Sequence, residues 1–351
     1  MRWQVVLVGA VLWALLAPPA WSEVAKESET CLECHGMEGM TMTLPSGEEV
    51  SVTVDRAAHE KSVHGSLLAC TDCHTDISGY PHPERKHQTK RQYTLALYEA
   101  CKQCHFEHYT RSLESIHYKL VAKGEEKAPV CVDCHGAHDI RRPNEPRNLI
   151  SQTCSKCHEE VSRAYEKSVH GEDLAKSGNP DVPVCTDCHS SHAIEDPRTR
   201  SFGMKTPELC GKCHSDKSKM EKYGLSTGVV QNYLQDFHGV SIKFQKAEKE
   251  APDGESLQPV CTDCHGVHDI ARTDDPNSTV IKTNLAKTCR KCHPDATESF
   301  PNAWLGHYEP TWTKAPLVKA ISLFYGVFIP FMVVGLLVQI VLHVWRVAIN
   351  R

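Results

Sequence analysis

Every cysteine in this chain of 351 residues belongs to one repeated pentapeptide, Cys-x-x-Cys-His. Two thiols at this spacing suit thioether bonds to the two vinyl groups of a porphyrin, and the histidine that follows suits ligation of the iron. The pentapeptide occurs nine times, uses all 18 cysteines and therefore predicts nine covalently attached c-type haems. The attachment cysteines are Cys31, Cys34, Cys70, Cys73, Cys101, Cys104, Cys131, Cys134, Cys154, Cys157, Cys185, Cys188, Cys210, Cys213, Cys261, Cys264, Cys289 and Cys292. The predicted proximal iron ligands are His35, His74, His105, His135, His158, His189, His214, His265 and His293.

Paired cysteines have two other common uses in proteins, disulfide frameworks and zinc ribbons. Exported small domains often use disulfides, but a disulfide framework gives no reason for a histidine after every pair. Paired Cys-x-x-Cys is also a zinc signature. Because all nine pairs are followed by histidine, and because an export signal precedes them, the pattern favours haem attachment over both alternatives.

A second set of histidines recurs at fixed places after the motifs. Methionine is too scarce to be the sixth ligand of all nine irons, because the chain has only six methionines after Met1. One further histidine follows each odd-numbered motif, and three even-numbered motifs extend to His-x-x-His. After the second motif His82 takes the matching place, with His87 as the reserve. The predicted distal ligands are His64, His117, His170, His238, His307, His138, His192, His268 and His82.

The sequence spacing also bears on which haem a distal histidine serves. His135 and His138 lie three residues apart, so on one helical turn their side chains would point to the same side, within about 5–6 Å. Two such ligands do not sandwich one porphyrin, so we expect His138, and likewise His192 and His268, to ligate a neighbouring haem. The alternative is a surface histidine beside a haem. The histidines without a recurring context are interpreted as surface residues: His59, His87 and His108.

The motifs alternate between two kinds, which indicates two-haem repeats. Core-forming residues are sparse between the apolar ends, so porphyrins would fill the interior. The predicted fold is a mainly α-helical and irregular haem-packed array with one small β-hairpin at residues 41–54 and one C-terminal transmembrane helix. The four predicted repeats and the final half repeat span about 31–100, 101–150, 151–205, 206–285 and 286–314.

Both ends of the chain carry apolar segments. Residues 1–22 resemble a secretory signal peptide, because their apolar run is too short to span a bilayer, and an N-terminal anchor is the rival interpretation. Residues 315–347 are long enough to cross a membrane and leave a short cytoplasmic tail, 348–351. We therefore expect a single-pass protein of the inner (cytoplasmic) membrane with residues 23–314 in the periplasm.

The charge of the chain argues against one class of partner. The formal net charge is −5 at pH 7, and no basic cluster occurs. We therefore expect no nucleic acid as a partner. An acidic surface favours a cationic docking partner instead.

The motifs resemble those of the bacterial multihaem cytochromes c. The likeness covers residues 31–350 and includes Ser-Val-His-Gly at residues 62–65 and Cys-Thr-Asp-Cys-His-Gly-Val-His-Asp-Ile at residues 261–270. In the family that shares these elements, the array accompanies a b-type membrane cytochrome. The resemblance implies electron exchange with the quinone pool, a role also filled by the NapC/NirT quinol dehydrogenases. The chain differs from the latter by its nine motifs and its C-terminal anchor.

One ionisable residue lies within the C-terminal apolar span. His343 is near the inner end of the span, with Arg346 one turn further on, and such a residue is a functional candidate. It could ligate a b haem shared with a partner subunit. Alternatively, its ring could reach the headgroups from an interfacial position. Both interpretations stay open at this point.

Two functions fit the pattern of ligands. The first is an electron carrier between a membrane b-type cytochrome or quinone-linked subunit and periplasmic redox proteins, since irons with two histidine ligands have no open position and favour low potentials. The second is a multihaem reductase of a small nitrogen or sulfur oxyanion with one open haem. The assignments of His82 and His307 decide between them, because loss of either ligand would open a site.

Overall fold

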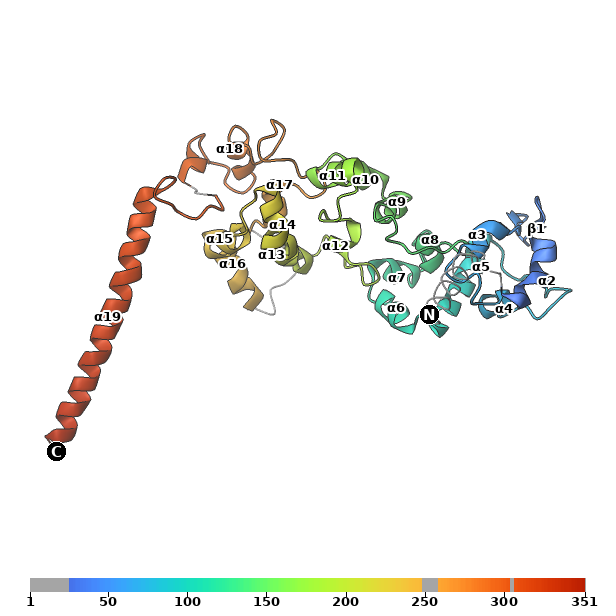
Figure 1. Cartoon of the computed structure of the whole chain (residues 1–351), viewed down its shortest axis with the longest axis horizontal. Helices are drawn as coiled ribbons and strands as arrows, with labels where there is room; N and C mark the ends of the chain where they lie inside the picture. Colours follow the sequence, from blue (N-terminus) through green and yellow to red (C-terminus); the bar gives the residue numbers. More distant parts are fainter. Residues whose placement is uncertain (1–24, 248–257, 304–305, 351) are drawn as a thin grey trace, which may run out of the picture. The chain divides into compact units, whose positions relative to one another are not determined.

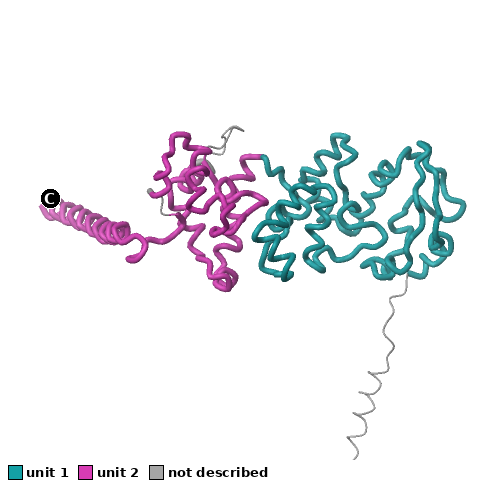
Figure 2. The backbone as a smooth tube through the Cα atoms, turned by 90° about the horizontal axis from the view of Figure 1, so that it is seen from above, with its two compact units in different colours: residues 1–198 teal, residues 199–351 magenta. Residues whose placement is uncertain are grey.

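The computed structural model describes residues 25–247, 258–303 and 306–350 (Figure 1). The chain divides into two compact units, coloured separately in Figure 2: unit 1 ends at Arg198 and unit 2 begins at Thr199. The predicted signal peptide, residues 1–22, lies outside the described residues. One helix, α13 (Arg200–His214), runs across the predicted boundary between the third and fourth repeats at residue 205.

Unit 1 is a series of short helices with one two-stranded sheet. Its elements are α2 (Lys26–His35), β1 (Thr41–Thr43), β2 (Glu49–Ser51), α3 (Arg56–Glu60), α4 (Cys70–Cys73), α5 (Lys90–Leu97), the 3₁₀ helix η1 (Tyr98–Gln103), α6 (Phe106–Ser112), α7 (Ile116–Val121), α8 (Cys131–His135), α9 (Leu149–Ser155), α10 (Glu159–Glu166), α11 (Val169–Ser177) and α12 (Cys185–His189). The hairpin predicted at residues 41–54 is present, with β1 antiparallel to β2 and Met42 opposite Val50.

Unit 2 is also helical, and it contains the longest described helix. Its elements are α13, α14 (Lys217–Met220), η2 (Glu221–Tyr223), α15 (Val229–Gln235), α16 (Phe237–Ala247), α17 (Cys261–His265), α18 (Leu285–Cys289), η3 (Phe300–Ala303) and α19 (Pro316–Ile349). The helices α15 and α16 pack on each other around a small apolar cluster of Tyr233, Ile242 and Val260.

Side chains form little of the interior in the described part of the chain. The buried hydrophobic residues are scattered, and several are no larger than alanine, such as Ala128, Ala286 and Ala296. Several of the most deeply buried residues are instead serines, among them Ser28 and Ser168. A soluble domain of this length normally buries a continuous apolar core. The sparse packing therefore agrees with an interior that is filled by groups other than side chains.

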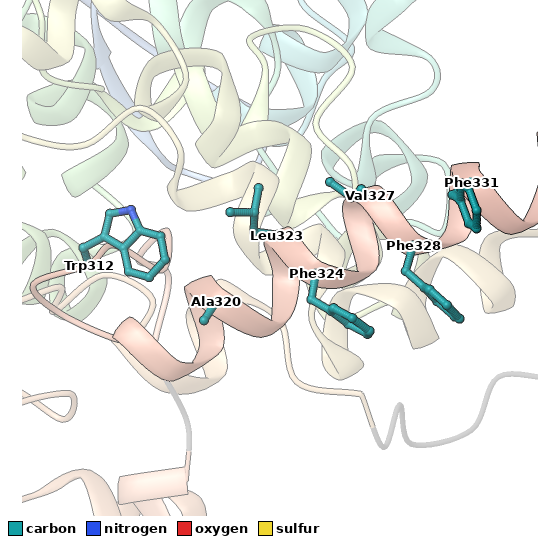
Figure 3. A pocket seen from close by; sticks show the side chains of 7 residues that line it. All are labelled: Trp312, Ala320, Leu323, Phe324, Val327, Phe328 and Phe331. Carbon is teal, nitrogen blue, oxygen red and sulfur yellow. The ribbon is translucent and has the colours of Figure 1, made fainter.

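The C-terminal helix α19 exposes its apolar side chains on every side. It is long and apolar enough to span a membrane, with a mean hydropathy of 2.5 and none of the spanning window buried. Phe324 and Phe328 stack on one side of it with ring centroids 5.3 Å apart (Figure 3). They line a shallow apolar pocket of about 410 Å³ together with Trp312. Such a surface is suited to lipid rather than to water.

Candidate haem-binding sites

The even-numbered motifs form short helices that begin at their first cysteine. In each of them the aspartate between the two cysteines turns back and accepts a hydrogen bond from the backbone N–H of the residue before the motif. The four bonds run from Ala69 to Asp72 (2.8 Å), from Val130 to Asp133 (2.7 Å), from Val184 to Asp187 (2.6 Å) and from Val260 to Asp263 (2.6 Å). This carboxylate satisfies one of the free N–H groups at the helix start. The recurring aspartate is therefore a helix cap rather than an iron ligand.

Arginines hold two of these aspartates in place. The Arg91 guanidinium donates to Asp133 at 2.9 Å and to the Glu126 carbonyl at 2.6 Å. Arg147 makes the equivalent bond to Asp187. Arg91 thus ties α5, and Arg147 the turn before α9, to the start of a later motif helix.

Two of the predicted distal histidines after the odd motifs, His117 and His170, lie in the first turn of helices α7 and α11, and the serine two positions earlier caps each helix, whereas His64 and His307 lie in turns. The Ser115 hydroxyl accepts a hydrogen bond from the His117 N–H at 3.2 Å, and the Ser168 hydroxyl accepts one from Gly171 at 3.1 Å. These serines are buried, with 4% and 2% of their surface exposed. Serine is a preferred N-cap residue. The Ser-x-His pattern therefore places the His117 and His170 imidazoles in the first turn of a helix.

A glycine follows three of these histidines because the backbone of an earlier helix is in contact there. A Cβ atom at Gly65 would lie 2.0 Å from the His59 carbonyl oxygen, and one at Gly171 would lie 2.0 Å from the Tyr165 carbonyl oxygen. Gly239 has the same contact, at 2.1 Å from Tyr233. The His-Gly dipeptide is therefore required for close approach of the two backbones.

Imidazoles face each other in pairs throughout the described chain. The His108 ring lies 6.3 Å from that of His105. Seven further pairs, each of one predicted proximal and one predicted distal histidine, have ring centroids 5.9–6.4 Å apart. The pairs are His35 with His82 (5.9 Å), His64 with His105 (6.0 Å), His74 with His138 (6.0 Å), His117 with His158 (6.1 Å), His135 with His192 (6.1 Å), His238 with His293 (6.4 Å) and His265 with His307 (6.4 Å).

This separation fits one iron between two imidazoles. A metal–imidazole bond is about 2 Å long, and the ring centre lies about 1 Å beyond the nitrogen, so two imidazoles on opposite sides of one metal have centroids about 6 Å apart. The rings are too far apart for a hydrogen bond between them. The residues present therefore fit a haem that is attached through the cysteines and ligated from both faces. Such a haem would supply a one-electron Fe(III)/Fe(II) couple.

The hydrogen bonds of the first pair leave the correct nitrogens for iron. His35 Nδ1 lies 2.8 Å from the Val52 carbonyl oxygen, next to the hairpin, and His82 Nδ1 lies 2.8 Å from the Gly79 carbonyl oxygen. Because a carbonyl only accepts, each Nδ1 must carry the proton. The Nε2 lone pair of both rings then remains for the metal, as is usual for histidine ligands.

The His-x-x-His segments contact motifs other than their own. His138 is opposite His74, and His192 is opposite His135. The reason is not the shared helical turn that the spacing suggested, because α8 ends at His135 and Gly136 has φ 79°. That conformation strongly favours glycine, and it turns the chain so that His138 points away from the helix. At the equivalent position in the second such segment, Ser190 adopts φ 61°.

The last distal ligand, His307, lies against helix α15. Its ring is 6.4 Å from that of His265, and the edge of the Tyr233 ring meets it at 5.9 Å. The Asn232 side-chain amide donates to the His307 carbonyl oxygen at 2.9 Å. Sequence reasoning overlooked both supporting residues, because nothing in the spacing of α15 distinguishes them from other polar or aromatic side chains.

Four predicted ligands lie in the expected local settings, although their iron partners remain predictions. His170 is in the first turn of α11, and His189 and His214 end α12 and α13. His268 follows α17 in the same setting as His138, after a glycine with positive φ, Gly266.

Burial keeps these imidazoles in the form that binds metals. Desolvation lowers the pKa of His74, His138 and His117 below the ordinary histidine value, and neighbouring imidazoles lower the pKa of His138 and His117 further. Desolvation acts in the same direction on His265. A lower pKa means that the ring is neutral near pH 7, and only a neutral imidazole ligates iron.

The cysteines of consecutive motifs lie side by side within each unit. The first cysteine of an odd motif lies close enough to the first cysteine of the next motif for the thiol of the latter to perturb its pKa in four places: Cys31 with Cys70, Cys101 with Cys131, Cys154 with Cys185, and Cys210 with Cys261. Second cysteines interact with the following motif, as Cys134 does with Cys157 and Cys264 with Cys292. Porphyrins attached to these sulfurs would therefore neighbour one another in chain order.

Two of the three histidines interpreted as surface residues, His59 and His87, are less exposed than predicted. His59 is half-buried, and its Nδ1 lies 3.1 Å from the His138 carbonyl oxygen. His87 is also half-buried, beside the Tyr93 ring. His108 is exposed, but its ring stacks on that of His192 with centroids 4.7 Å apart. They are supporting side chains around the paired imidazoles.

Comparisons with known proteins agree with this arrangement. Residues 124–215 match the cytochrome c3 family model. The chain is 25% identical over 199 residues to the multiheme cytochrome MtrA of Shewanella baltica, covering 55% of this chain and 54% of that protein. It is 26% identical over 133 residues to the cytochrome c-type protein NrfB of Escherichia coli O6:H1, covering 34% of this chain and 65% of that protein. The matches thus span less than two thirds of either relative. No solved structure matches the chain.

Proposed function

We propose that this chain, a multihaem c-type cytochrome, is a membrane-anchored periplasmic protein with nine haems that relays electrons in anaerobic respiration. The electrons would pass between the quinone pool, through a membrane b-type cytochrome or quinone-linked subunit, and periplasmic redox proteins. The relatives named as a multiheme cytochrome and a cytochrome c-type protein support the cytochrome part of this proposal.

The pairing of imidazoles is the observation that carries the proposal. In each of the seven pairs, a second histidine would take the place that a substrate would need on the iron, as His192 would opposite His135. An iron ligated on both faces passes electrons but binds no substrate. The two assignments that could have opened a site, His82 and His307, both have a proximal imidazole opposite them. The arrangement therefore favours a carrier over a reductase.

The order of the motifs supports a continuous path for electrons within each unit. Consecutive motifs have adjacent cysteines, and the first two His-x-x-His segments each connect two haem sites, because His138 follows His135 of the fourth motif but faces His74 of the second, and His192 of the sixth faces His135 of the fourth. The His-x-x-His segments would therefore hold the haems that they connect at fixed positions relative to one another.

The haem between His265 and His307 would be tethered closest to the anchor. His307 precedes the start of α19 by nine residues, which span at most about 30 Å when extended. Between them lie the exposed Trp312 and the Lys314 ammonium, which sits 4.4 Å from the centre of the Tyr308 ring. Tryptophan, tyrosine and lysine are typical of the membrane interface. Electron exchange with the membrane side would therefore involve this haem.

The test is spectroscopic, on the purified full chain made with a working cytochrome maturation system. A pyridine haemochrome assay should give nine haems per chain, and electron paramagnetic resonance should show only low-spin iron. Addition of cyanide or nitrite should leave the spectrum unchanged. A high-spin ferric signal that disappears with these ligands would instead support the reductase.

Membrane attachment and the link to quinol need a separate measurement. In membrane vesicles, a quinol should reduce the haems of the full chain only when a membrane partner is present. A chain that ends at residue 313 should appear in the soluble fraction with the same absorption spectrum. Recovery of the full chain from the soluble fraction would refute the anchor without affecting the haem assignments.

A further inference from the structure

The N-cap of helix α16 departs from the pattern of the other repeats. His64, His117 and His170 each have a serine two residues earlier, and Ser115 and Ser168 are the N-caps of α7 and α11. In α16, Asp236 stands two residues before His238, and its Oδ1 accepts a hydrogen bond from the Gly239 N–H at 2.9 Å. The cap itself needs only one oxygen acceptor, which serine supplies equally well. The second carboxylate oxygen is therefore not explained by capping.

That second oxygen lies in a closed environment. Asp236 Oδ2 is buried and has no hydrogen-bond partner among the described residues. A buried carboxylate oxygen without a donor destabilises a fold unless something nearby stabilises its charge. Because the neighbouring repeats manage with a neutral serine, the charge at this position calls for a role beyond folding.

The surroundings of Asp236 point to His307. Asn232 precedes Asp236 by one helical turn, so the two side chains lie on the same face, and Asn232 binds the His307 carbonyl oxygen. The Tyr233 ring contacts the His307 ring from the same segment. Burial lowers the pKa of the His307 imidazole, and the negative charge of the nearby Asp236 carboxylate acts in the opposite direction on that pKa. The carboxylate therefore acts on a ligand of the haem attached to Cys261 and Cys264.

We propose that Asp236 is a positioning residue that orients the His307 imidazole and lowers the reduction potential of the haem held by Cys261, Cys264 and His265. Carboxylates beside ligating histidines fix the ring and raise its basicity. A negative charge near the iron also stabilises the ferric over the ferrous state. The inference rests on the proposed haem ligation, and it assigns the lowered potential to the haem tethered nearest to α19.

The experiment compares Asp236→Ser and Asp236→Asn with the parent full-length protein in a spectroscopic redox titration. Both replacements keep a good N-cap, so the thermal unfolding temperature should stay the same. One of the nine one-electron steps should shift toward easier reduction by about tenfold, which is about 59 mV. Asp55→Ser is the matched control, because Asp55 caps α3 through Ala58 but is exposed. The control should leave all nine steps unchanged.

A double variant assigns the shift to a particular haem. Replacement of His307 by methionine raises the potential of the haem that it ligates. If Asp236 acts through His307, adding Asp236→Asn to His307→Met should produce a smaller further shift than Asp236→Asn alone. Unchanged potentials in both Asp236 variants would overturn the inference, as would equal shifts in the Asp55 control or loss of the haem from both variants. A parent protein without low-spin haem would instead refute the proposed function itself.

Discussion

The His138 imidazole faces that of His74 with ring centroids 6.0 Å apart, although His138 follows the proximal ligand of its own motif by only three residues. The turn at Gly136 separates the two histidines of the segment and directs them to different sites. One short segment of backbone would thereby contribute ligands to two irons. Any displacement of this segment would change both haems together.

The first prediction separates the two histidines of this segment. Replacement of His138 by alanine should remove the sixth ligand from the haem of Cys70 and Cys73 and leave the haem of Cys131 and Cys134 six-coordinate. Electron paramagnetic resonance should then show one high-spin iron per chain. His108→Ala is the control, because His108 is exposed and the proximal imidazole beside it, His105, already has His64 opposite it. A high-spin iron in the control, or none in the His138 variant, would contradict the pairing.

The second prediction concerns the first haem. The His82 ring lies opposite that of His35, whereas the neighbouring His87 packs against Tyr93. His82→Ala should therefore create a site that binds cyanide, and His87→Ala should not. The readout is the change of the Soret band on addition of cyanide to each purified protein. If only the His87 variant bound cyanide, His87 and not His82 would be the distal ligand of this haem.

Much of the candidate site could be predicted from local sequence, because local chemistry determines it. The pentapeptide defines the attachment cysteines, and the Ser-x-His pattern reflects a helix cap such as Ser115, which needs only neighbouring residues. The hairpin follows from alternation around a turn. The apolar length of α19 likewise requires no tertiary information.

The pairing of ligands could not be predicted in the same way, because it depends on contacts between distant segments. His64 and His105 are 41 positions apart, and the sequence around either histidine does not indicate that they form a pair. The role of Asp236 was overlooked for the same reason, since its neighbour His307 belongs to a segment that returns to α15 only in the folded chain. Asp236 did carry one signal, its replacement of the serine found in the other repeats.

A third prediction tests the close contact of backbones behind the distal ligands. Alanine at Gly65 would place a methyl group against the His59 carbonyl and should cost about 1–3 kcal/mol of unfolding free energy by overpacking. Gly203 is the matched control, because it lies within α13 and a Cβ there meets nothing within 4 Å. Gly203→Ala should stabilise the protein by about 1 kcal/mol. Denaturant unfolding of both variants measures the difference, and equal effects would refute the contact.

The last prediction addresses His343, the ionisable residue within α19. His343 lies six residues before Ile349, the last residue of the helix, which corresponds to about 9 Å along its axis. A side chain this close to the end of a span reaches the headgroups, and Arg346 lies one turn nearer to the end. We therefore expect His343→Ala to leave membrane b-haem absorption and the rate of quinol oxidation unchanged. Gln339→Ala, one turn deeper in the helix, should behave in the same way. A loss of b-haem absorption in the His343 variant alone would show that His343 ligates a haem shared with a partner subunit.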